Sequence, residues 1–162
     1  MKEELQKKLY EKYPKIFSQK DLPLSETCMC WGICHDDGWY NILDTLCARI
    51  QHHIDYKNCE GEYESMRKHR SPEPDGTWLQ VRQVEATQVK EKWGGLRFYY
   101  NGGDEFINGL VTFAESISLR TCETCGVPGR PTKKGWIRTM CKPCADAAQK
   151  ELMGEFDDKE GE

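Results

Sequence analysis

Four cysteines near the C-terminus have the spacing of a metal site. They form two Cys-x-x-Cys pairs, Cys122 with Cys125 and Cys141 with Cys144, and Gly126 directly follows the first pair. Two such pairs about a finger's length apart are typical of a tetrahedral zinc site with four thiolate ligands. Because four thiolates leave no position for water or substrate, we expect one structural zinc ion. A redox pair or plain buried thiols are the alternative interpretation, which the spacing disfavours.

A second group of candidate metal ligands lies within eight residues nearer the N-terminus. It comprises three cysteines and one histidine: Cys28, Cys30, Cys34 and His35. These side chains could hold a second zinc ion, although Cys-x-Cys-x-x-x-Cys is not a common zinc spacing. Free cysteine is also an ordinary small residue of protein cores. The sequence therefore leaves a second metal site and unliganded thiols both open.

Recognised catalytic patterns are missing from the sequence. It contains no glycine-rich phosphate loop, no Ser–His–Asp order and no His-Glu-x-x-His. Asp36 or Asp37 is expected to cap the helix that follows, so these carboxylates need no catalytic explanation. We therefore expect a protein without enzymatic activity and keep an enzyme with an unrecognised site as the third alternative.

A basic and aromatic segment around a glycine turn is the best candidate for a ligand-binding surface. Two extended runs with alternating polarity flank Gly94 and Gly95, which predicts an antiparallel hairpin. Because alternate residues of a strand share a face, the polar side chains would lie opposite the apolar ones. An open face of basic and aromatic residues could stack a base and neutralise phosphate. The candidate ligand-binding residues are Lys90, Lys92, Trp93, Arg97 and Tyr99. The alternative is a purely structural hairpin with buried aromatic rings and solvated charges.

Apolar periodicity predicts the scaffold around these groups. Spacings of three and four residues predict helices over residues 2–13, 39–56 and 104–119. In the last helix, the expected buried face consists of Phe106, Ile107, Leu110, Val111, Phe113, Ala114 and Ile117. With the hairpin, these helices predict an α+β fold in which helices pack on one face of a small antiparallel sheet. This body would span residues 1–119, with an exposed charged loop at about 58–76.

The segment after the body predicts a zinc finger and a tail. Residues 120–152 combine a Cys-x-x-Cys-Gly turn, a short ribbon and a cysteine pair at a helix start, an order that resembles the treble-clef arrangement. Basic residues outnumber acidic ones in the ribbon, which could therefore bind nucleic acid. The candidate phosphate-binding residues are Arg130, Lys133, Lys134, Arg138 and Lys142. Residues 153–162 are acidic, and we expect them to form a disordered tail.

The composition indicates a soluble protein in a reducing compartment. Apolar residues make up 38% and charged residues 31% of the 162 positions. No apolar run approaches the length of a membrane span, and the charged N-terminus has no signal-peptide pattern. Nine cysteines without a secretion signal favour metal ligation over disulfides, which predicts a cytosolic location.

Three motifs resemble those of a group of short, mostly uncharacterised bacteriophage and prophage proteins. They are DGWYNILD at 37–44, QVKEKWGGLRFY at 88–99 and CETCG at 122–126. The resemblance carries over no activity and no catalytic residues. It implies a phage accessory protein in the cytoplasm of a bacterial host, and such proteins often act by binding a host protein or a small ligand.

Two binding functions follow from these observations. The favoured one is a non-enzymatic, zinc-stabilised protein that inhibits or sequesters a host component, either a defence protein or a nucleotide signal held on the hairpin. The alternative is nucleic-acid binding through the basic finger, which the overall net charge of -4 disfavours. The sequence indicates no oligomeric state.

Overall fold

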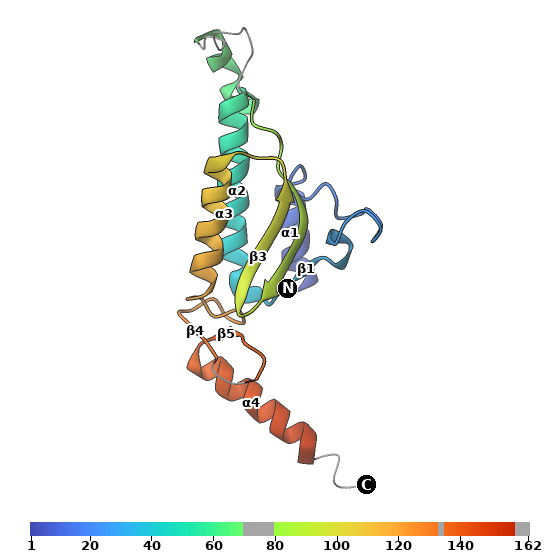
Figure 1. Ribbon diagram of the computed structural model, residues 1–162, viewed down its shortest axis with the longest axis vertical. Coiled ribbons are helices and arrows are strands. Elements are labelled where there is room, and N and C mark those ends of the chain that lie inside the picture. The colour runs from blue at the N-terminus through green and yellow to red at the C-terminus, as the bar shows by residue number, and fades with distance from the viewer. Residues whose placement is uncertain (70–79, 133–134, 158–162) are drawn as a thin grey trace.

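The computed structural model describes the backbone of residues 1–69, 80–132 and 135–157, with side chains as far as residue 151. It has the predicted α+β architecture, in which four helices accompany a three-stranded sheet and a two-stranded sheet. The C-terminal finger that carries the four clustered cysteines lies at one end of the body (Figure 1).

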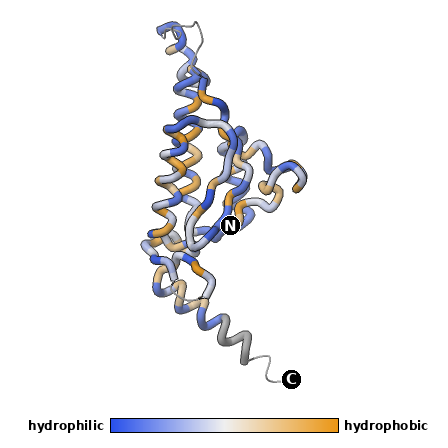
Figure 2. The backbone as a smooth tube through the Cα atoms, viewed as in Figure 1, coloured by the Kyte–Doolittle hydropathy of each residue, from blue (hydrophilic) through white to orange (hydrophobic). Residues whose placement is uncertain are grey.

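Two long helices form the frame of the body and lie side by side (Figure 1): α2 (Tyr40–Asn58) and α3 (Glu105–Ser118). The apolar positions of α2 recur every three or four residues, so one stripe of the helix enters the core. The buried side chains of this stripe are Leu43, Leu46, Cys47, Ile50 and Ile54. Figure 2 shows such apolar positions in orange along both helices, between blue polar ones. α1 (Glu3–Lys12) adds Leu9 to the same core.

The sheet contains the predicted hairpin and one strand that the sequence did not indicate. β2 (Glu85–Lys92) pairs antiparallel with β3 (Gly95–Asn101), and Val89 lies opposite Phe98. β1 (Ile33–Cys34) adds a short parallel edge on the other side of β2. Val89 and Phe98 are buried in the core that the helices share, so one face of the sheet is covered.

The hairpin turn lies one residue earlier than Gly94-Gly95. Trp93 and Gly94 form the two-residue connection, with φ angles of 58° and 76°. Positive φ at both positions is the geometry that matches the twist of two paired strands. Gly95 belongs to β3, where a Cβ atom would come within 3.0 Å of Leu119 Cδ2. Trp93 is therefore a bulky residue in a backbone conformation that favours glycine or asparagine.

α3 buries a narrower face than its apolar content predicts. Asp104 caps the helix as its side chain accepts a hydrogen bond from the Ile107 amide over 3.1 Å. The buried side chains are Ile107, Val111, Ala114 and Ser118. Phe106, Phe113 and Ile117 are exposed, so the expectation that all seven apolar residues share one buried face is wrong. Seven apolar positions cover more of a helix circumference than one contact with α2 and the sheet can bury.

Two segments depart from the boundaries expected from the sequence: the predicted charged loop after α2 and the predicted C-terminal tail. A 3-10 helix over Gly61–His69 occupies the start of the predicted charged loop and buries no side chain, while residues 70–79 lie outside the described part. At the C-terminus, α4 (Lys142–Asp157) continues the finger into the segment expected to be a disordered tail. Residues 158–162 lie outside the described part of the chain.

Candidate metal centre and the groove beside it

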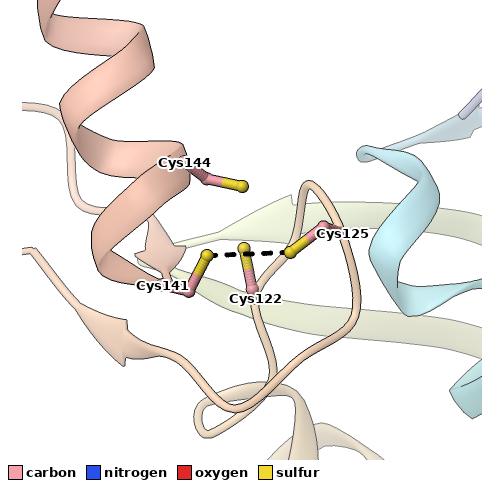
Figure 3. Close-up of side chains that lie close together, drawn as sticks. All are labelled: Cys122, Cys125, Cys141 and Cys144. Carbon is pink, nitrogen blue, oxygen red and sulfur yellow. Dashed lines mark hydrogen bonds between the residues drawn. The ribbon is translucent and has the colours of Figure 1, made fainter.

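The four C-terminal cysteines converge on one point. Cys122 and Cys125 lie in the loop that follows α3, Cys141 directly precedes α4, and Cys144 lies in the first turn of that helix (Figure 3). Their sulfur atoms all lie within 4.8 Å of one another, and the Sγ atoms of Cys125 and Cys141 are 3.7 Å apart. A tetrahedron with Zn–S bonds of about 2.3 Å has sulfur–sulfur edges of about 3.8 Å. The sulfur positions therefore fit a tetrahedral metal ion.

Local backbone structure holds the first pair in a tight knuckle. Gly126 has a φ of 81°, and its amide donates to the Cys122 carbonyl oxygen over 2.9 Å. The Cys122 amide in turn donates to the Val127 carbonyl oxygen over 2.7 Å. The ribbon of β4 (Arg130–Pro131) and β5 (Thr139–Met140) then returns the chain to the second pair. This order of knuckle, ribbon and helix is the one expected for a treble-clef-like finger.

The electrostatics of the sulfur cluster suit a cation. Burial opposes ionisation of Cys122, but hydrogen bonds from the backbone of Cys141, Cys125 and Thr124 outweigh it and lower the pKa of Cys122 to about 7. Interactions with the thiols of Cys141 and Cys125 raise the pKa of Cys144. Four sulfurs at this separation cannot all ionise on their own, and a divalent cation removes that conflict because it binds thiolates directly.

The N-terminal cysteine group does not form a second cluster of this kind. Among the side chains of residues 1–69, 80–132 and 135–151, the four C-terminal cysteines are the one group of three or more candidate ligands that could share an ion. Cys34 is exposed and His35 is buried, because neighbouring residues of an extended segment point to opposite faces. The structure therefore does not support the candidate site at Cys28, Cys30, Cys34 and His35, whose three thiols are exposed and free.

The finger is docked on the loop that precedes α2. The Gly38 amide donates to the Glu123 carbonyl oxygen over 2.7 Å, and the indole N–H of Trp39 donates to the Thr121 carbonyl oxygen over 2.8 Å. A Cβ atom on Gly38 would lie 2.5 Å from the Gly126 nitrogen and 2.6 Å from the Glu123 oxygen. The backbones of body and finger are therefore in direct contact at Gly38.

An ionic cluster completes this junction. Arg138 Nε donates to Glu123 Oε2 over 3.1 Å, and its guanidinium also pairs with Asp36. Glu123 is buried, and this burial raises its pKa, while Arg138 opposes the rise. The Asp36 amide adds a hydrogen bond of 3.2 Å to Glu123 Oε1. Since a buried carboxylate needs such partners, Arg138 serves the junction between body and finger.

The two aspartates before α2 do not cap that helix. Asp36 pairs with Arg138, and Asp37 accepts from the Lys2 amide over 2.8 Å. Trp39 occupies the cap position, and its side chain makes no hydrogen bond that caps the helix. The expected cap is wrong because long-range partners take both carboxylates.

The finger ribbon also contacts the hairpin turn. Thr139 Oγ1 donates to the Gly94 carbonyl oxygen over 2.5 Å, and Trp136 Nε1 donates to Glu91 Oε2 over 3.3 Å. Glu91 Oε1 accepts from the Gly94 amide over 2.6 Å. The finger with the four clustered cysteines is thus fixed against the turn of the sheet.

A groove of about 390 Å³ opens between the hairpin turn and the ribbon. Its described lining consists of Lys90, Glu91, Lys92, Trp93, Gly135, Trp136 and Ile137. The side chains of Trp93 and Trp136 are 69% and 79% exposed. Small-molecule sites occupy roughly 300–1,000 Å³, so this groove has room for a small ligand.

The predicted ligand-binding residues of the hairpin divide into two groups. Lys90, Lys92 and Trp93 line the groove. Arg97 lies outside it, where it donates to the Leu96 carbonyl oxygen over 2.6 Å and approaches Glu115 at 3.9 Å. Tyr99 is exposed and stacks under the Lys90 ammonium at 5.6 Å from the ring centre. Trp136 was not expected in this site, because one tryptophan in a basic ribbon carries no sequence signal for it.

The candidate phosphate-binding residues of the finger are not equivalent. Arg130 and Lys142 are exposed, whereas Arg138 is held by Asp36 and Glu123. Lys133 and Lys134 lie outside the described residues. The structure therefore removes Arg138 from the set of free surface cations.

Comparisons with known proteins identify no relative. No family model matches the chain, and no curated protein and no solved structure matches it either. Of the helices in the described part of the chain, none has the length and apolar character to span a bilayer. Function must therefore be argued from the site itself.

Proposed function

We propose that this chain is a non-enzymatic, zinc-stabilised accessory protein of phage type that captures a nucleotide signal of its bacterial host in the groove beside the finger. The observation that carries the proposal is Trp93. It is largely exposed and adopts a φ of 58°, which costs about 1–3 kcal/mol in a residue other than glycine. Neither its burial nor its backbone explains a tryptophan at this position, whereas a stacking role does.

Zinc is the metal that the donor set favours. Tetrahedral sites with four sulfur ligands hold zinc or iron, and zinc is typical of small structural fingers. Its role here is to fix the ribbon that carries Trp136 against the hairpin that carries Trp93. The closed set of four thiolates leaves no position for substrate, which supports a structural role.

The chemistry of the groove favours an aromatic anion. Two exposed indoles offer faces for a planar ring, and Lys90 and Lys92 offer positive charge beside them. Glu91, the acidic residue of the described lining, already accepts hydrogen bonds from Gly94 and Trp136. A single nucleotide combines the ring and the phosphate that these groups recognise. A protein surface with an exposed aromatic anchor and acidic neighbours is the other host component that this groove would accept.

Nucleic-acid binding is the second candidate, because Arg130 and Lys142 are exposed on the finger. The engagement of Arg138 at the junction weakens it. The two candidates differ in salt dependence. A nucleic acid that contacts several phosphates loses affinity steeply with salt, with a slope of about -0.7 per phosphate for a single strand, while a mononucleotide gives a shallow slope.

The test is a titration of the zinc-loaded chain with linear and cyclic mononucleotides and with single-stranded oligonucleotides, followed by calorimetry. Native mass spectrometry of protein from a bacterial host reports the metal count and any retained ligand. We expect mononucleotide binding that Trp93→Ala and Trp136→Ala each weaken at least tenfold. Trp31→Ala is the matched control, because Trp31 is 67% exposed and lies outside the groove. Binding that is equal in all three variants would contradict the proposal. Affinity that rises with oligonucleotide length, with a steep salt slope, would favour the second candidate.

A further inference from the structure

The outer surface of α2 and α3 carries an apolar face that the described molecule covers only in part. The Phe106 ring stacks on His53 with ring centres 4.4 Å apart and is still 53% exposed. On α3, an apolar stripe follows a spacing of four, three and four residues: Phe106, Leu110, Phe113 and Ile117. Phe106, Phe113 and Ile117 are exposed, while Leu110 is half-buried against the core. This stripe lies beside the buried face of the same helix, so it is additional to the core contact. The spacing is that of a helix seam, which keeps side chains in line for contact with another helix.

The stripe borders a shallow groove of about 320 Å³ between the two helices. Its lining is mostly apolar and includes Ile42 and Leu46 of α2 with Leu110, Phe113 and Ile117 of α3. Phe106 and Phe113 are 53% and 65% exposed. With about 200 Å² for a whole aromatic side chain, these two rings alone leave roughly 240 Å² of apolar surface in water. A standard protein interface buries about 800 Å² on each partner, so the patch can supply its apolar centre.

A glycine on the same side of α3 points to close approach by another chain. Gly109 is exposed in the middle of the helix, and a Cβ atom at this position would meet nothing within 4 Å. Glycine in a helix interior costs roughly 0.5–1 kcal/mol relative to alanine. No contact within the described molecule requires the absence of a side chain at Gly109. A helix backbone crossing beside Phe113 would require it, since small residues permit close helix contacts.

The charges at the two ends of α3 indicate how a second helix would be oriented against it. Glu105 is exposed in the first turn, and Arg120 is exposed just beyond the last turn. Within the described residues, neither side chain forms an ion pair. A second copy of α3 in antiparallel orientation would bring each Glu105 near the Arg120 of the other copy. The same arrangement places opposite ends of the two helix dipoles side by side.

We propose that this face is a self-association surface, on which a second copy of the chain packs its α3 antiparallel around a twofold axis. Such an interface is isologous, so one patch serves both copies and every contact occurs twice. Phe106 of one copy lies near Ile117 of the other, and Leu110 lies near Phe113. The surface is separate from the nucleotide groove and does not depend on the function proposed for it.

The test is sedimentation equilibrium of the full-length, zinc-loaded chain over a wide range of concentration. We expect a reversible monomer–dimer equilibrium. Phe113→Glu places a charge at the contact in both copies and should weaken association at least 100-fold. Trp31→Glu is a control of similar exposure outside the face and should leave association unchanged. A chain that is monomeric at every concentration, or a dimer that Phe113→Glu leaves intact, would overturn the proposal.

A charge exchange tests the orientation independently of the apolar contact. Glu105→Arg and Arg120→Glu should each weaken the dimer several-fold, because each creates two pairs of like charges. The double variant Glu105→Arg/Arg120→Glu should restore association to near the original level. Failure of the double variant to recover would rule out the antiparallel arrangement. Circular dichroism checks that the variants keep their helices, which is expected because both residues are exposed.

Discussion

Gly38 and Glu123 join the body to the four-cysteine finger by a backbone hydrogen bond of 2.7 Å between the Gly38 amide and the Glu123 carbonyl oxygen. This contact brings the loop before α2 against the knuckle that holds Cys122 and Cys125. The contact requires glycine, since a Cβ atom at Gly38 would overlap the backbone of the knuckle. The finger is thereby held against the body, and the groove between Trp93 and Trp136 depends on this contact.

Gly38→Ala should loosen the finger from the body. The added methyl group would lie 2.6 Å from the Glu123 carbonyl oxygen, and overpacking of this kind costs about 1–3 kcal/mol. Urea unfolding measures the loss, and hydrogen exchange of residues 120–131 should become faster. Gly61→Ala is the control, because nothing lies within 4 Å of its Cβ position and only its positive φ costs about 1 kcal/mol. Equal exchange rates in Gly38→Ala and the unsubstituted chain would refute the docking role.

Cys125→Ser should abolish tight metal binding and unfold the finger while the body stays folded. The apolar core consists of side chains between Leu9 and Ala114, so it contains no residue of the finger. The finger has no comparable core, and zinc supplies an apparent ~10–16 kcal/mol to such modules. Elemental analysis should find one zinc per chain before the substitution, and hydrogen exchange should localise the loss to residues beyond 120.

The control for the metal site is Cys30→Ser. Cys30 is an exposed free thiol outside the cluster, so its loss should leave both the zinc content and the exchange pattern unchanged. Treatment with a strong chelator should reproduce the effect of Cys125→Ser in the unsubstituted chain. A finger that keeps its protection without metal would show that the four cysteines do not form a structural site.

His35 should make the protein less stable in acid. Its Nδ1 donates to the Asp36 carbonyl oxygen over 2.7 Å, and Nε2 is buried without a partner among the described atoms. Burial lowers the pKa of His35 from 6.5 to about 4. Between about pH 6.5 and about pH 4, His35 is therefore protonated in the unfolded chain and neutral in the folded chain. The free energy of unfolding falls as the pH drops through this range. The lowered pKa of His35 reduces the free energy of unfolding by about 3 kcal/mol once the pH is below both the unfolded and the folded pKa.

The measurement for His35 compares two pH profiles of the free energy of unfolding. His35→Phe keeps a ring beside Trp39, which lies 5.3 Å from His35 between ring centres. Other titrating groups contribute to the pH dependence of both proteins. The difference between the two profiles therefore gives the contribution of His35 alone. Between about pH 7 and about pH 4.5 the unsubstituted chain should lose about 2–3 kcal/mol more than the variant. Parallel profiles would mean that His35 is not held neutral.

Local sequence patterns predicted those parts of the molecule that depend on short-range spacing. The two long helices follow from apolar residues three and four apart, and the cluster of four cysteines follows from two Cys-x-x-Cys pairs. The hairpin was predicted, but its turn moved by one residue, because Gly94-Gly95 suggested a glycine turn that the strand register does not use. Gly95 is needed instead for contact with Leu119.

The junction between body and finger could not be predicted from the sequence. Arg138 and Asp36 are 102 residues apart, and no local pattern connects them. β1 contains two residues, which is too short for an alternating pattern. The apolar content of α3 was visible, but its division into a buried face and an exposed face depends on how closely α2 and the sheet approach. These features are set by tertiary packing.

Trp93→Asn should stabilise the fold and abolish ligand binding. Trp93 and Gly94 are the two turn residues with positive φ, and Asn-Gly is a favoured sequence for that geometry. Since the tryptophan side chain is 69% exposed, its removal sacrifices little burial. We expect a gain of about 1 kcal/mol in urea unfolding, because asparagine tolerates the left-handed conformation better. Calorimetry should show that nucleotide binding is lost.

Trp136→Asn separates the two effects. Trp136 lines the same groove and is similarly exposed, but it is not among the residues with positive φ. Its replacement should weaken nucleotide binding and should not stabilise the fold. The variant also loses the 3.3 Å hydrogen bond from Trp136 to Glu91. If Trp93→Asn were more stable and still bound ligand, the strained turn would have no role in recognition. A stability gain that coincides with loss of binding identifies Trp93 as a residue whose backbone strain is retained for function.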